Sequence, residues 1–119
     1  MSLFEELKEL GVDVNEGLER VMGDEPLYET MLGMFIDKIN SNPIEIEDFN
    51  AENLDELVGR VHMLKGLTGN LAMLPLFESY MQVLDLLRAD CPTEAMQVYK
   101  RMLPTQVAMI ECIKRYISD

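Results

Sequence analysis

The stretch LDELVGRVHMLKGLTGNL, residues 54–71, decides the fold because its apolar residues recur with the period of an α-helix. Successive helical residues are roughly 100° apart, so side chains three and four positions apart share a face. Asn53, followed three residues later by Glu56, is a variant of the capping box that starts a helix. We therefore predict a helix that begins near residues 51–53, reaches about Asn70 and buries one face. That face comprises Leu54, Leu57, Val61, Leu64, Thr68 and Leu71.

The rest of the chain carries the same helical period, and no stretch alternates as a strand does. Residues 44–49 are acidic, and their secondary structure remains ambiguous. Pro104 lies inside the last predicted helix and should kink or interrupt it near Met102–Leu103. The expected inward face of that helix comprises Met96, Tyr99, Leu103, Val107, Ile110, Ile113 and Ile117. We predict helices over about 3–10 and 15–22, from an Asp24–Pro26 start to about Asn40, over about 76–89, and from a Thr93 cap toward Ser118.

Four long amphipathic helices joined by short connections indicate an all-α fold, an antiparallel up-down-up-down four-helix bundle. The chain of 119 residues has the length of one domain. We predict that residues 1–22 form short extra N-terminal helices and that residues 23–119 form the bundle.

The net charge of −12 is concentrated in the first half of the chain. Residues 1–60 carry four Lys or Arg against sixteen Asp or Glu, whereas residues 61–119 carry six of each. A nucleic-acid partner requires a basic surface, and an anionic membrane would repel this half. The charge favours a protein partner, although solubility alone would also explain it.

The chain lacks the features of a secreted or membrane protein. Its N-terminus has no basic flank followed by an apolar run, and no stretch of about 18 apolar residues occurs. Two cysteines, Cys91 and Cys112, do not make a disulfide framework, so we expect free, partly buried thiols. A single histidine without a cysteine cluster argues against a structural zinc site. We expect a cytoplasmic protein.

His62 is the only histidine, and Gly59, Gly66 and Gly69 surround it. At helical spacing these four residues form one stripe that points away from the leucine face. Each glycine inside a helix costs about 1 kcal/mol relative to alanine. We interpret the stripe as clearance for a partner that approaches the imidazole. A lone histidine is more often a residue without such a role, and that interpretation stays open.

The residues near His62 suit phosphoryl chemistry. Lys65 lies one turn further on the same side, where an ammonium can hold an anion placed on the imidazole. A neutral imidazole is a nucleophile, and a phosphoryl group is the electrophile that such a cation favours. No GxxxxGK[ST] or GxGxxG motif occurs, so the phosphoryl group would come from another protein. Met63 and Met73 would give an adaptable contact surface nearby, although most of the methionines fit core positions.

The pattern His62-x-Leu64-Lys65-Gly66 within a bundle helix resembles the signature of histidine-containing phosphotransfer (HPt) domains. Residues 69–72 resemble its small-residue continuation, and residues 11–18 and 23–28 resemble the segments that precede the first bundle helix. The resemblance covers about residues 11–88, and the last helix matches in type only. Ala72 stands where the family commonly has glycine, Gly69 replaces the more usual serine or alanine, and Gly59 is unusual.

This resemblance implies that His62 accepts the phosphoryl group, that Lys65 helps to hold it and that Gly66 leaves it room. It implies a carrier in a two-component multistep phosphorelay, without kinase activity, cofactor or metal of its own. The partners would be receiver domains of response regulators and hybrid histidine kinases, which supply the magnesium. We expect a monomer whose docking surface includes Gly59, Met63 and Gly69, together with residues 31–35 or Asp37 of the preceding helix.

Two other classes stay open. The chain could be a non-catalytic bundle that only binds a receiver or kinase domain. It could also be an unrelated helical interaction protein in which His62 is incidental. A phosphotransfer domain of a chemotaxis kinase would need catalytic domains after Asp119, so we expect a free-standing protein or an excised domain.

Overall fold

The computed structural model describes residues 1–50, 52 and 54–117, and helices account for most of them. In the described residues there is no strand, only an isolated bridge between Val12 and Met73. The prediction of an all-α fold is therefore confirmed. The helices are α1 (Leu3–Glu9), α2 (Val14–Glu19), α3 (Glu25–Ser41), α4 (Leu54–Asn70), α5 (Leu74–Arg88) and α6 (Pro92–Tyr116), with the short 3-10 helix η1 (Ile46–Asp48) before α4.

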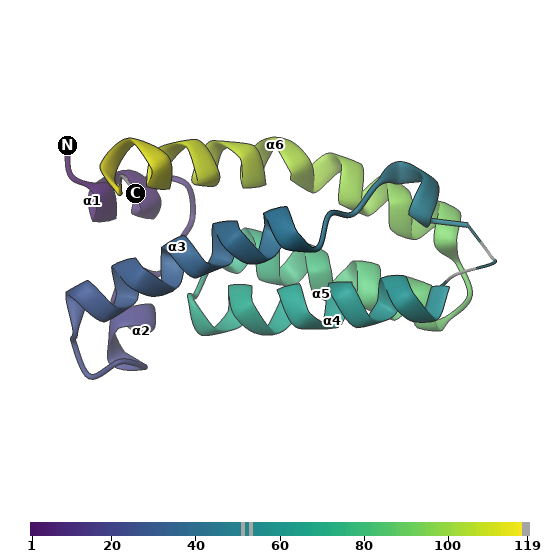
Figure 1. Cartoon of the computed structure of the whole chain (residues 1–119), viewed down its shortest axis with the longest axis horizontal. Helices are drawn as coiled ribbons and strands as arrows, with labels where there is room; N and C mark the ends of the chain where they lie inside the picture. The colour runs from purple at the N-terminus through teal and green to yellow at the C-terminus, as the bar shows by residue number, and fades with distance from the viewer. Residues whose placement is uncertain (51, 53, 118–119) are drawn as a thin grey trace.

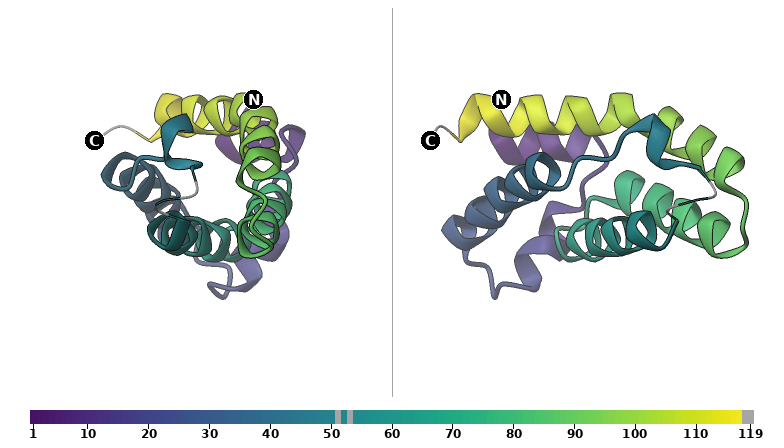
Figure 2. Two further views of the ribbon diagram at one scale, coloured as in Figure 1. Left: turned by 90° about the vertical axis from the view of Figure 1, so that its right-hand side faces the viewer. Right: turned by 45° about the vertical axis from the view of Figure 1, so that its right-hand side comes forward.

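Helices α3, α4, α5 and α6 alternate in direction and form the predicted bundle (Figure 1). Viewed along its length, the bundle arranges these four helices around a common interior (Figure 2). Helix α5 packs along both α4 and α6, whereas α1 lies against α6 and α2 lies against α3. The molecule measures 42 × 24 × 22 Å.

Side-chain caps explain where the N-terminal helices begin. The Ser2 hydroxyl accepts the Glu5 amide at 3.2 Å, and the Glu5 carboxylate accepts the Ser2 amide at 3.1 Å, which completes a capping box. The Asp24 carboxylate accepts the Leu27 amide at 3.1 Å, and Pro26 occupies the first turn. The predicted start of α3 is therefore confirmed. The predicted Asn53 cap of α4 lies outside the described residues.

The structure corrects one expectation for α6 and decides between the two effects predicted for Pro104. Cys91, not Thr93, stands at the N-cap, because the turn after α5 is tight and Pro92 already occupies the first helical turn. Pro104 does not interrupt α6, which is one helix of 25 residues, although its ribbon bends part way along (Figure 1). Pro104 is exposed, as is Lys100, whose carbonyl loses its helical donor. Water can therefore satisfy that carbonyl.

The predicted core face of α4 is confirmed at Leu57, Val61, Leu64 and Thr68, whereas Leu54 is only half-buried. The expected face of α6 was wrong by one residue along much of its length. Val107 is 49% exposed, whereas Gln106 is 4% exposed. The Tyr80 hydroxyl donates a hydrogen bond to the Gln106 side-chain oxygen, so a polar residue occupies a core position that apolar counting assigned to its neighbours.

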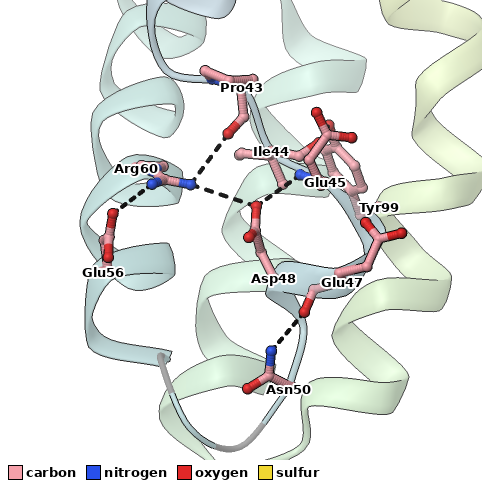
Figure 3. A network of polar contacts seen from close by, with 9 residues as sticks. All are labelled: Pro43, Ile44, Glu45, Glu47, Asp48, Asn50, Glu56, Arg60 and Tyr99. Atoms are coloured by element: carbon pink, nitrogen blue, oxygen red, sulfur yellow. Dashed lines mark hydrogen bonds and ion pairs between the residues drawn. The ribbon is translucent and has the colours of Figure 1, made fainter.

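The ambiguous segment before α4 covers one end of the bundle, and Arg60 of α4 holds it there (Figure 3). One nitrogen of the guanidinium donates to the Pro43 carbonyl at 3.2 Å and lies 3.4 Å from an Asp48 carboxylate oxygen. The other nitrogen donates to Glu56 at 2.5 Å. The Tyr99 hydroxyl donates to the Ile44 carbonyl at 3.3 Å. Arg60 and Tyr99 thus fix this connection from two bundle helices.

Candidate functional site

Helix α4 presents its leucine face to the core and a stripe of small residues to solvent. His62, Gly59 and Gly66 are exposed, and Lys65 is half-buried. The prediction that His62 faces outward is therefore confirmed. The hydroxyl of the buried Thr68 donates to the Leu64 carbonyl at 2.8 Å, so this polar group is satisfied within the core face.

The three glycines of the stripe have different surroundings. A Cβ atom at Gly59 or Gly66 would meet no other atom within 4 Å, so packing does not require a glycine at either position. A Cβ atom at Gly69 would lie 3.0 Å from ring carbons of Phe77 on α5. The close approach of α5 therefore gives Gly69 a packing reason that Gly59 and Gly66 lack, and its part in partner clearance stays a prediction. Only Gly59 and Gly66 leave open space beside His62.

Lys65 lies three residues after His62 on α4, a helical spacing that puts Cβ atoms about 5–6 Å apart. Among residues 1–50, 52 and 54–117, every ion pair is made by an arginine, namely Arg20, Arg60 or Arg115. The Lys65 ammonium therefore takes part in no ion pair within the described chain and is available to an anion.

The residues expected near the docking surface are partly exposed, as Met34 is at 48%, and partly buried. Met63 is half-buried and packs against the core, so only part of its side chain is accessible. Met73 and Phe35 are both 0% exposed and cannot contact a partner. Asp37 is exposed on α3, and Gly69 lies beside the Phe77 ring of α5, which a Cβ atom at Gly69 would approach to 3.0 Å.

A groove beside the stripe was missed by sequence analysis. It has a volume of about 290 Å³ and lies where α2, the C-terminal end of α4 and the start of α5 meet. The sequence offers no direct signal for it, because α2 and α4 are far apart along the chain. The residues around it are Glu16, Arg20, Lys65, Gly66, Gly69, Asn70, Leu74 and Phe77.

The two cysteines are free, as expected, with Cys91 half-buried and Cys112 buried. Burial raises the pKa of the Cys112 thiol, which keeps it in its neutral form. Within the part of the chain that the structure describes, no three His, Cys, Asp or Glu side chains converge on a position for a metal ion. These groups therefore give no second candidate centre to compare with His62.

No described helix combines the length and the apolar character that crossing a bilayer requires. No family model matches the chain, and neither the curated proteins nor the solved structures include a significant match. The function must accordingly be argued from the residues around His62.

Proposed function

We propose that this protein is a phosphoryl carrier of a multistep phosphorelay, resembling the HPt domains. His62 would accept a phosphoryl group from a phosphoaspartate of one receiver domain and pass it to an aspartate of another. The observation that carries the proposal is the pairing of an exposed imidazole with Lys65 one turn away and with two glycines that packing does not require. Each such glycine lowers the stability of the helix by about 1 kcal/mol relative to alanine. Because packing does not require these glycines, a functional reason for the open space is favoured.

The proposed transfer needs no cofactor in this chain, because the bond that forms is matched by the bond that breaks. A neutral ring nitrogen of His62 attacks phosphorus in line with the bond to the aspartate oxygen. The nitrogen–phosphorus bond forms as that phosphorus–oxygen bond breaks, and the aspartate leaves as a carboxylate. The other ring nitrogen then loses its proton to water. Reversal on a second receiver returns the carrier to its starting state.

Lys65 and Gly66 have separate parts in this proposal. The Lys65 ammonium would lie beside the phosphoryl oxygens and stabilise the charge that spreads over them during transfer. Gly66 would leave room for those oxygens and for the partner's surface, since a Cβ atom there projects into open space. Magnesium would be bound by the receiver. A receiver domain as partner also places the carrier in the cytoplasm.

The test follows the phosphoryl group directly. A panel of receiver domains, each labelled on its aspartate, is incubated with the protein, and label on the carrier is measured over time. We expect at least one receiver to label the wild-type chain and none to label His62→Gln. Label that persists in His62→Gln would contradict the proposal. Tight binding without label would instead assign the chain to the non-catalytic interaction proteins.

A further inference from the structure

The groove beside the stripe brings a second cation to the candidate site. Arg20, the residue after α2, borders it together with Lys65 and Gly66, which also belong to the proposed phosphoryl site. The groove is therefore continuous with that site. Leu74, which is 37% exposed, and the half-buried Phe77 supply an apolar side.

Specific contacts hold α2 against the end of α4. The Asp13 amide donates to the Ala72 carbonyl at 2.9 Å, just before α2 begins. The Tyr28 hydroxyl donates to the Leu71 carbonyl at 2.8 Å. A Cβ atom at Gly17 would lie 2.5 Å from the Tyr28 ring, so only glycine lets α2 approach this closely. The position of Arg20 is therefore fixed by the fold.

Arg20 can exchange the carboxylate with which it pairs. Its guanidinium pairs with Glu16 at 3.2 Å, and the two side chains are 48% and 43% exposed. Exposed pairs of this kind contribute little, typically 0.2–1 kcal/mol, so another carboxylate can compete for the arginine. Arg20 is also one of only four Lys or Arg in the acidic first half of the chain.

We infer that Arg20 determines partner specificity by binding an acidic side chain of the receiver domain that docks over His62. This inference rests on the proposed phosphotransfer function. An arginine fork binds a carboxylate through two hydrogen bonds, a geometry that lysine cannot reproduce. The apolar side of the groove, at Leu74 and Phe77, contacts the apolar residues beside that acid. Lys65 acts on the phosphoryl group, whereas Arg20 acts on the receiver.

Steady-state phosphotransfer separates these roles, with the carrier in catalytic amounts between a phosphorylated receiver that labels the wild-type chain and an excess of a second receiver that accepts the group. For Arg20→Ala we expect the KM for the phosphorylated receiver to rise roughly fivefold, with kcat unchanged and a weaker dependence on salt. The matched control is Arg88→Ala, which removes an exposed arginine at the opposite end of α5 and should change neither constant.

The outcomes distinguish this inference from the phosphotransfer proposal. An unchanged KM in Arg20→Ala, with His62 still labelled, overturns the role of Arg20 and leaves the carrier function intact. A fall in kcat at constant KM also overturns it, because Arg20 would then act on the chemistry. Failure of every receiver to label the wild-type chain removes both proposals. Circular dichroism checks that the Arg20→Ala variant is folded.

Discussion

The glycines on the outer face of α4 differ in their surroundings, and this difference separates the glycine that packs against α5 from those that leave open space beside His62. A Cβ atom at Gly69 would crowd the Phe77 ring at 3.0 Å, whereas Gly59 and Gly66 face open space. A spacing pattern alone treats all three alike. Only the position of α5 shows that Gly69 serves packing and that the two others weaken α4 without a packing benefit.

We predict that Gly66→Ala makes the protein more stable and less active. Alanine in a helix interior should raise the free energy of unfolding by about 1 kcal/mol, because its Cβ atom meets nothing. The same methyl group would lie beside the phosphoryl group on His62 and slow its transfer. Urea unfolding and the rate of labelling by a receiver measure the two effects.

Gly33→Ala is the matched control, since Gly33 lies inside α3 and a Cβ atom there also meets nothing within 4 Å. It should give a similar gain in stability, and it is a reference for stability alone because Gly33 lies within residues 31–35 of the expected docking surface. Equal labelling rates for wild type and Gly66→Ala would remove Gly66 from the site.

Lys65→Ala should slow phosphotransfer without unfolding the bundle. Removing one cation from the transition state should lower kcat by about 10- to 100-fold, because an ammonium that meets the phosphoryl oxygens stabilises their charge. Lys65 is only half-buried and makes no ion pair within the described residues, so helicity should persist. Lys100→Ala, at an exposed position on α6, is the control. Loss of helical circular dichroism in Lys65→Ala would contradict the assignment.

At the scale of the elements, four helices end in the same way. After the last turn, one residue takes a left-handed conformation, and the next amide donates to the carbonyl five residues before it. Glycine is the usual choice at that position, yet only one of the four ends uses it. The left-handed residues are Gly11 (φ 98°), Met22 (φ 55°), Ala72 (φ 55°) and Asp90 (φ 60°).

Ala72 shows how backbone strain and side-chain burial compete at such a helix end. The Met73 amide donates to the Thr68 carbonyl at 2.9 Å, so α4 closes as it would with glycine. The alanine conformation is strained by about 1–2 kcal/mol, but its methyl group is fully buried. Burial of that group offsets part of the strain. The alanine at position 72 therefore gives the end of α4 the same backbone form that a glycine would give.

Met22 offers the clearest test of this strain because its side chain is 97% exposed and packs against nothing extensive. We predict that Met22→Gly raises the free energy of unfolding by about 0.5–1 kcal/mol. Relief of the left-handed strain exceeds the added freedom of glycine in the unfolded chain. Met22→Ala keeps the strain and should change stability little. A gain from alanine equal to that from glycine, measured by urea unfolding, would contradict this explanation.

At the scale of the whole molecule, the sequence predicted what depends on local periodicity and failed where distant segments meet. The helices, the outward direction of His62 and the start of α3 at Asp24 all follow from short-range patterns. The burial of Gln106 does not, since it depends on Tyr80 from another helix. Pro104 has the milder of its two predicted effects, because a proline on the exposed side of a packed helix bends it without breaking it.

The groove lay beyond sequence reasoning for the same reason. Its two cations, Arg20 and Lys65, come from segments that meet only because Gly17 admits the Tyr28 ring and Tyr28 binds the end of α4. The spacing around His62 could indicate a phosphoryl site but not the surface beside it. The proposed chemistry is thus local in the sequence, whereas partner choice depends on the assembled fold.

The same buried tyrosines predict how the whole bundle responds to alkali. Burial raises the pKa of Tyr28 to about 12 and that of Tyr99 to about 12, from an ordinary value of 10.0, and raises the pKa of Tyr80 further. The folded chain therefore holds protons that the unfolded chain releases above about pH 10. The contribution of these tyrosines to the free energy of unfolding should be constant below that pH and fall as pH rises toward 12. Because these rings link α3, α5 and α6, we expect one cooperative transition, in which tyrosinate absorbance and loss of helical circular dichroism coincide.

The Tyr28→Phe variant should lose about 1 kcal/mol of stability at neutral pH, because it lacks the hydrogen bond to the Leu71 carbonyl. Between pH 10 and 12 it should lose less stability than the wild type does. Tyrosinate forming near pH 10 in three or more of the four tyrosines while the helices persist would show that these rings are accessible and would contradict the packing described.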